Sequence, residues 1–296
     1  MGTIIKIVGI GEIGVQVLDD IILKIIENVE FISMDTDSAR LEGSRAHRKI
    51  LLEPDFEKGI PFFEQNKAIS NALASADLIV LVSGVRNETE AAAPSVIANI
   101  VKNTGALIVS FAVIPFSDEK TECPNSANSG VFLLMENSDA LMICPGEKLT
   151  DNHENTIKSL YDVLYYDIRA LAEMLLPAGN ALFDIGDICS ILGDAGVFSI
   201  SVGEGYGKNK VRDAVEKAVN GSLTPMKGAA AVLSVIKGGN DLGLHDIEQA
   251  ASLLFDALNL DSDAKFLWGH AHDPNMSDSI KLTIMAAGMN EPFVNS

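Results

Sequence analysis

Three glycines near the N-terminus have the spacing of a phosphate-binding turn. Gly9, Gly11 and Gly14 form a G-x-G-x-x-G pattern between an apolar run and a helical pattern. Such a turn lets a phosphate approach the backbone amides at a helix N-terminus. Asp35 ends the next apolar run, where a dinucleotide-binding fold places the acid that holds the ribose hydroxyls. The pattern predicts a nucleotide site, and a turn used only for close strand–helix packing is the alternative.

Two further groups of residues have chemical potential. Asp184 and Asp187 are three residues apart at the start of a helical pattern, where they either cap the helix or present two carboxylates on one face. His270 and His272 alternate on a predicted strand, so their imidazoles share a face. A metal site needs three or four ligands. We find no third ligand for the histidine pair, so we expect no metal site.

The elements that position these residues are strands alternating with helices in the first half of the chain. A helix is predicted from about Gly14 to Glu27. The predicted strands are Thr3–Val8, Glu30–Met34, Leu78–Val82, Ala106–Ala112 and Leu141–Cys144. Continuous apolar runs alternating with helical patterns predict an α/β fold with a parallel sheet covered on both faces.

A long helical pattern separates the two halves. Apolar residues recur at spacings of three and four from His153 to Leu175, before Pro177 and Gly179. The second half predicts a smaller α+β domain with a mixed sheet, with strands at Val197–Gly203, Ala231–Ile236, Lys265–Ala271 and Ile280–Ala286 and helices at Asp184–Leu192, Asp213–Asn220 and His245–Leu258. The predicted domains are therefore residues 1–152, a central helix over 153–178, and residues 179–296.

Composition excludes several functions. The 296 residues are 47% hydrophobic, which supplies a core and argues against a disordered chain. The net charge of −19 repels phosphate backbones and anionic lipid surfaces, so we expect neither nucleic-acid binding nor direct membrane contact. No apolar run is long enough to span a bilayer, and no signal peptide precedes the first strand. Three widely spaced cysteines suggest reduced thiols and a cytoplasmic protein.

Several segments resemble the FtsZ/tubulin family. The run Glu30–Leu41 ends its strand in Asp35-Thr36-Asp37, where the family has an Asn-Thr-Asp turn that faces the nucleotide. The likeness returns at Ala76–Pro94, at Gly105–Phe116 and at Asp184-x-x-Asp187, and it is strongest at Trp268–Gly288. The resemblance covers the whole chain in order. It implies a Rossmann-like GTPase-type domain, a long central helix and a smaller α+β domain.

The resemblance also implies functional roles. Members of this family bind GTP and stack head to tail, and two acids of one subunit complete the active site of the next. Asp184 and Asp187 match that acidic pair, which acts in trans. Gln16 replaces an asparagine that faces the guanine, and Asp162 matches a residue that reads the base. The cofactor-binding positions implied by the glycine turn and the resemblance together are Gly9, Gly11, Gly14, Gln16, Asp35, Gly84, Thr89 and Asp162.

The sequence departs from the family around the phosphates. The family signature Gly-Gly-Gly-Thr-Gly-Thr-Gly is replaced by Ser83–Ala91, which retains Gly84 and Thr89 and introduces Glu88 and Glu90. Glu12 adds another acid in the first turn. Side chains block the close backbone approach that glycine permits, and acids repel a triphosphate. We expect GTP binding and hydrolysis to be weakened or lost, with Mg²⁺ present only if nucleotide binds.

Three functions remain open. The first is a cytoskeletal or cell-division-type protein that associates with itself or with a canonical FtsZ-like protein, without the C-terminal adaptor-binding tail, because only Asn290–Ser296 follow the last predicted strand. The second is an active GTPase with an altered phosphate cradle. The third is an NAD-type dinucleotide-binding enzyme that uses Gly9, Gly11, Gly14 and Asp35, for which the second domain offers no convincing acid or base.

Overall fold

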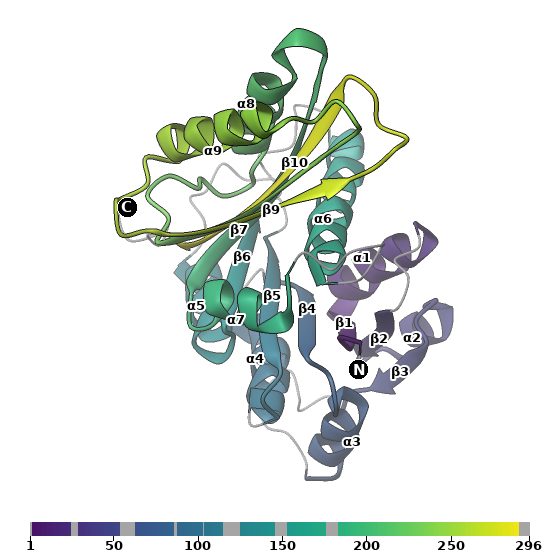
Figure 1. The fold of residues 1–296 in the computed structure, drawn as a ribbon. Helices are drawn as coiled ribbons and strands as arrows, with labels where there is room; N and C mark the ends of the chain where they lie inside the picture. The colour runs from purple at the N-terminus through teal and green to yellow at the C-terminus, as the bar shows by residue number, and fades with distance from the viewer. Residues whose placement is uncertain are drawn as a thin grey trace. The chain divides into compact units, whose positions relative to one another are not determined.

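The computed structural model describes residues 2–24, 29–53, 63–85, 88–102, 104–114, 125–145, 153–175 and 183–289. The chain divides into two compact units, Met1–Tyr165 and Tyr166–Ser296. Helix α6 (His153–Leu175) contributes residues to both. Figure 1 shows the elements of each unit.

Unit 1 (Met1–Tyr165) is built on a parallel sheet. The strand order is β3-β2-β1-β4-β5-β6, and every neighbouring pair runs parallel. The strands are β1 (Ile5–Ile10), β2 (Val29–Asp35), β3 (Arg48–Leu51), β4 (Leu78–Gly84), β5 (Leu107–Ile114) and β6 (Ala140–Pro145). The central strands are almost wholly buried, as expected for a parallel sheet with helices on both faces.

Helices cover both faces of this sheet. They are α1 (Gly11–Leu23), α2 (Ser38–Gly43), α3 (Phe63–Leu73), α4 (Glu88–Lys102) and α5 (Asn125–Asn137). Alternate residues of the central strands, including Val8, Ile32 and Leu81, share one core with apolar residues of α3 and α4. Because successive strand residues point to opposite faces, the intervening residues face α1, and Gly14 of α1 touches the Val82 carbonyl.

Unit 2 (Tyr166–Ser296) contains a mixed sheet with the order β7-β10-β8-β9. Strand β10 pairs antiparallel with β7 and β8, whereas β8 and β9 run parallel, which confirms the predicted mixed sheet. Its elements, after the last residues of α6, are α7 (Ile185–Leu192), β7 (Gly196–Tyr206), the short 3₁₀ helix Gly207–Asn209, α8 (Lys210–Asn220), β8 (Ala231–Gly238), α9 (Leu244–Leu258), β9 (Lys265–His272) and β10 (Ser279–Met289).

Glycines let helix α8 lie directly on strand β7. A Cβ at Gly203 would be 2.0 Å from the Ala214 carbonyl oxygen, and one at Gly205 would be 1.8 Å from the Lys210 carbonyl oxygen. Any side chain at these two positions would force the helix away from the sheet. Of the helices described, none is long and apolar enough to cross a membrane.

The α/β fold class is confirmed, but several predicted boundaries are wrong. The first strand is Ile5–Ile10 rather than Thr3–Val8, and the following helix, Gly11–Leu23, begins at Gly11 rather than at Gly14. The predicted helix end at Glu27 lies outside the described residues. The reason is the backbone of Gly11, which has a φ of +69°. One left-handed residue completes the turn, so the strand leads directly into the helix without a loop. Strand β3 and the short helix α2 were not predicted.

Candidate functional site

The carboxyl ends of three neighbouring strands place the predicted nucleotide-binding residues at one edge of the unit 1 sheet. In the parallel register, Ile10 of β1 lies beside Met34 of β2 and Ser83 of β4. The next residues, Gly11, Asp35 and Gly84, therefore lie together at this edge. Ligands of open α/β sheets bind outside the carboxyl ends of the strands.

Three of the predicted glycines are required by packing. A Cβ at Gly9 would be 2.4 Å from the Gly14 carbonyl oxygen, and a Cβ at Gly14 would be 2.2 Å from the Val82 carbonyl oxygen. A Cβ at Gly84 would be 2.8 Å from the Ile13 side chain. Close contact between β1, β4 and α1 thus accounts for these glycines without a ligand, which was the alternative explanation of the motif.

Gly11 is different, because its neighbourhood is open. A Cβ built at this position meets nothing within 4 Å, and the φ of +69° is what requires glycine here. Ile10 precedes helix α1 as its N-cap and makes no side-chain capping bond. The first turn of α1 thus has no side-chain cap, and such a helix end attracts an anion.

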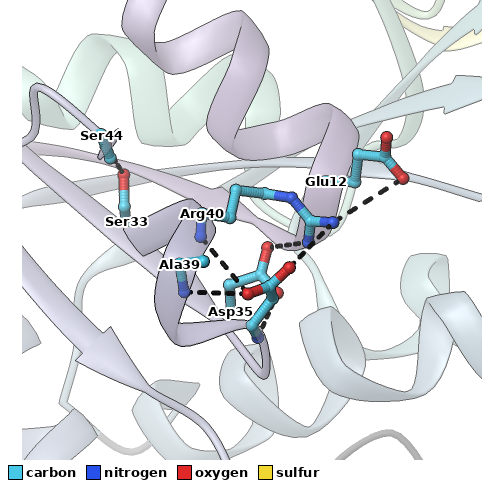
Figure 2. Close-up of polar contacts among 7 residues, drawn as sticks. Glu12, Ser33, Asp35, Ala39, Arg40 and Ser44 are labelled. Carbon is cyan, nitrogen blue, oxygen red and sulfur yellow. Dashed lines mark hydrogen bonds and ion pairs between the residues drawn. The ribbon is translucent and has the colours of Figure 1, made fainter. Parts of the chain in front are cut away.

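An ionic cluster beside this helix end is the main feature of the site (Figure 2). Nη1 of Arg40 lies 2.6 Å from Oδ2 of Asp35, and Nη2 lies 3.6 Å from Asp37 and 4.0 Å from Glu12. The other oxygen of Asp35 accepts the Asp37 N–H at 2.8 Å. We call Glu12, Asp35, Asp37 and Arg40 the Arg40 cluster.

Helix α2 fixes the position of Arg40. The Asp37 side chain caps this helix by accepting the N–H groups of Ala39 and Arg40. At the other end of α2, the carboxylate of Asp19 in α1 accepts the Ser44 hydroxyl at 2.9 Å and the Arg45 N–H at 2.7 Å. These bonds tie both ends of the short helix to its surroundings, so the guanidinium is held in place.

The cluster contains three carboxylates and one guanidinium, so negative charge prevails. Asp35 is 3% exposed at its side chain, Arg40 is 30% exposed and Glu12 is 53% exposed. The hydrogen bond to Asp35 and the surrounding acids raise the pKa of Arg40. The guanidinium therefore stays charged, and both Asp35 oxygens already have partners within the chain.

Arg40 is the site residue that the sequence analysis missed. It lies three residues after Asp37 in a helix, a spacing that brings opposite charges together. That spacing was the feature of the sequence that could have identified Arg40. The approach of Glu12 from helix α1 had no such signal, because it depends on how α1 and α2 pack.

The remaining predicted cofactor residues are more scattered. Gln16 is exposed on α1. Thr89 lies in the first turn of α4, and its side chain is outside the described part of the chain. Asp162 of α6 forms an ion pair with Lys24, whose Nζ also lies 4.7 Å from the centre of the Tyr165 ring.

In unit 2, Asp184 and Asp187 cap helix α7 reciprocally. Oδ1 of Asp184 accepts the Asp187 N–H at 2.9 Å, and Oδ2 of Asp187 accepts the Asp184 N–H at 3.0 Å. This is the capping box that the sequence offered as one explanation of the pair. It uses one oxygen of each carboxylate, and Asp184 is exposed.

The parallel α/β unit with its strand-end site and the mixed α+β unit define the class of fold, and comparison with known proteins identifies the family. The model of the Tubulin/FtsZ family GTPase domain matches residues 4–154, and that of the FtsZ family C-terminal domain matches residues 196–290. The chain belongs to the tubulin/FtsZ family of cytoskeletal proteins.

Solved structures share this fold along nearly the whole chain. An empty FtsZ dimer from M. jannaschii is 24% identical, with a TM-score of 0.80 over 97% of this chain and 89% of that chain. CetZ2 from Haloferax volcanii, a GTPγS-bound protofilament, is 15% identical, with a TM-score of 0.78 over 98% and 94%. CetZ from Methanosaeta thermophila is 17% identical, with a TM-score of 0.79 over 97% and 87%.

Proposed function

We propose that this chain is a filament-associated cytoskeletal protein whose own GTP binding and hydrolysis are weakened or lost. It associates head to tail with itself or with a canonical FtsZ-like protein. The observation that carries the proposal is the Arg40 cluster, in which Glu12 and Asp35 add two carboxylates to Asp37, the one acid of the cluster that the family's Asn-Thr-Asp turn also has.

The negative charge of the site weakens the binding of a triphosphate. Glu12 lies in the first turn of α1 and brings a negative charge to the helix end that would hold a phosphate. Even at the dielectric of bulk water, a like charge about 4 Å away costs on the order of 1 kcal/mol. Arg40 offsets part of this cost, but its charge is already shared among three carboxylates.

Asp35 adds to this argument. Its two oxygens are bonded to Arg40 and to the Asp37 N–H. A ribose hydroxyl or a hydrated Mg²⁺ would have to share this carboxylate with both partners, and its side chain is only 3% exposed. The same engagement weakens the case for an NAD-type enzyme, which would need Asp35 for the ribose.

An active GTPase with an altered cradle is the second candidate. The open space at Gly11 and the absence of a side-chain cap on α1 favour it, because both leave room for an anion. Mg²⁺ would offset some of the acids in that case.

For unit 2 we propose that Asp184 and Asp187 act in trans on a neighbouring subunit. Each carboxylate has a second oxygen that the capping box does not use. Two structures of related fold, an FtsZ dimer from M. jannaschii and a CetZ2 protofilament from Haloferax volcanii, are assemblies, and they support this association.

Nucleotide titration tests the first half of the proposal. GTP, GDP and NAD(H) are titrated with and without Mg²⁺ by calorimetry and by thermal shift, since a ligand of the folded state raises the melting temperature. We expect no binding up to millimolar nucleotide for the native chain. E12Q should lower the Kd for GTP by about fivefold, from the ~1 kcal/mol estimate above, so a thermal shift should appear for E12Q at GTP concentrations that leave the native chain unshifted. Micromolar GTP binding by the native chain would favour the GTPase.

Association with a canonical FtsZ tests the second half. We expect the chain to co-sediment with GTP-loaded FtsZ and to change its GTP turnover. D187N should reduce the effect on turnover, because the amide retains the capping acceptor but removes the charge. The matched control is D194N, which changes an exposed acid just beyond the same helix. Equal effects of the two substitutions would contradict a role for the acidic pair.

A further inference from the structure

Strand β9 is an open edge of the unit 2 sheet. Within the described part of the chain, β8 is its one strand neighbour. At the two ends of the pair, the Lys265 N–H bonds the Ala230 carbonyl and the Asp273 N–H bonds the Gly238 carbonyl, both at 2.9 Å. In a parallel ladder alternate residues bond the neighbour, so the odd-numbered residues of β9 face β8. The peptide groups facing the open edge are those of Phe266, Trp268, His270 and His272.

Strand β3, an edge of the unit 1 sheet, shows how an edge is normally protected. Strand β3 has four residues and begins with the exposed cations Arg48 and Lys49. Short length and charge are the usual means of preventing an edge from pairing with another chain. Strand β9 has eight residues, its register with β8 is uninterrupted, and Lys265 is its one charged residue apart from histidine.

The side chains of β9 are also incompletely covered. None of its eight residues is buried, although the strand includes Phe266, Leu267 and Trp268, which are half-buried. His270 and His272 are exposed on the same face as Trp268. An eight-residue edge with half-exposed aromatic side chains is a template for strand addition.

We propose that β9 pairs antiparallel with β9 of a second copy of this chain. When the two-fold axis that relates the two copies passes through Gly269, the facing residues of the two β9 strands are complementary. Lys265 then lies opposite the partner's Asp273, Phe266 lies opposite the partner's His272, and Trp268 lies opposite the partner's His270. Because the two-fold axis exchanges the two strands, each of these contacts occurs twice.

The backbone permits this register and the side chains favour it. The open peptide groups belong to the even-numbered residues, and these fall at the hydrogen-bonded positions of the antiparallel pair. Opposite charges and aromatic pairs directly across two strands each stabilise the pair. Charge complementarity at both ends is what identifies a second copy as the occupant. Asp273 keeps its ion pair with Lys237 at 2.8 Å, and one carboxylate can accept from two lysines.

This pairing uses different residues from the proposed head-to-tail contact, although Nζ of Lys265 donates to the Ser190 carbonyl of α7 at 3.2 Å. A chain that pairs through β9 would join two subunits side by side. Failure of either proposal therefore leaves the other standing.

Cysteine cross-linking tests the register. In a chain in which Cys123 and Cys189 are replaced by serine, G269C places two thiols opposite each other on the two-fold axis. Non-hydrogen-bonded antiparallel pairs have Cα atoms about 4.5 Å apart, which a disulfide can span. A271C is the matched control, because its two copies would be about 13 Å apart along the strand. We expect a covalent dimer for G269C under mild oxidation and at least tenfold less for A271C.

Proline substitution tests the backbone pairing. The His270 N–H faces the open edge, so H270P should keep the β8 ladder while removing a bond to the partner. H270P added to G269C should abolish the cross-link, whereas H270A, which keeps the N–H, should retain it. Circular dichroism confirms that each variant is folded. Equal cross-linking of G269C and A271C, no cross-linking of G269C, or cross-linking that survives H270P would each overturn the proposal.

Discussion

Replacing Arg40 by methionine should show whether the buried carboxylate of Asp35 depends on this guanidinium. The Asp35 side chain is 3% exposed, and its Oδ2 lies 2.6 Å from Nη1 of Arg40. Breaking a fully buried ion pair costs about 3–5 kcal/mol, whereas breaking a surface pair costs about 0–1 kcal/mol. Arg40 is 30% exposed, which places this pair between the two cases. We expect R40M to lower the free energy of unfolding by about 2 kcal/mol.

Urea unfolding followed by circular dichroism measures this change. The matched control is R45M, which removes an exposed arginine just beyond the same helix and should cost less than about 0.5 kcal/mol. D35N removes the charge but retains the oxygen that accepts the Asp37 N–H. A double-mutant cycle of R40M and D35N should therefore give a coupling energy of about 1–2 kcal/mol.

The result that would refute this reasoning is a cost of R40M no larger than that of R45M, with no coupling to D35N. The Arg40 cluster would then be an unimportant surface contact. The electrostatic argument for weak phosphate binding would lose its basis, because Asp35 would be free to exchange Arg40 for a ligand.

Three further predictions concern stability. Burial raises the pKa of Asp167 well above its usual range, and its Oδ2 lacks a hydrogen-bond partner among the described residues. The native state therefore binds the proton more tightly than the unfolded state, and stability falls as pH rises above the unfolded pKa of about 4. D167N should stabilise the protein by about 1–3 kcal/mol near neutral pH, and urea unfolding at decreasing pH should show that gain disappear. In thermal melts G14A should be more destabilising than G11A. A Cβ at position 14 would lie 2.2 Å from the Val82 carbonyl oxygen. A Cβ at position 11 would have open space, so G11A should cost only the strain of the positive φ, about 1–2 kcal/mol. D187A removes half of the capping box with Asp184 and should cost about 1 kcal/mol, whereas D187N should cost less.

The fold class could be predicted because local patterns and tertiary structure agree. Short continuous apolar runs such as Leu78–Val82 are typical of strands covered on both faces, and all of these residues lie in β4. The long helix His153–Leu175 has the predicted bounds. Strand β3 was missed because its four residues, RKIL, are partly charged and lack the apolar pattern of a buried strand.

The candidate site could be predicted only in part. The glycine spacing located the strand-to-helix turn, but the spacing is the same whether a glycine is needed for a ligand or for packing. Contacts between elements decide this, and they assign Gly9 and Gly14 to packing while leaving Gly11 open. The acid at Asp35 was predicted, but its pairing with Arg40 was not.

The sequence by itself determined the order of the elements, the α/β class and the family resemblance, because these depend on periodicity and on motifs that are local along the chain. Tertiary structure alone decided that Glu12 and Asp35 share one guanidinium and that β9 lies at an open edge. The physical reason is that charge pairing and strand order depend on distances between elements, and those distances are set by packing rather than by neighbours in sequence.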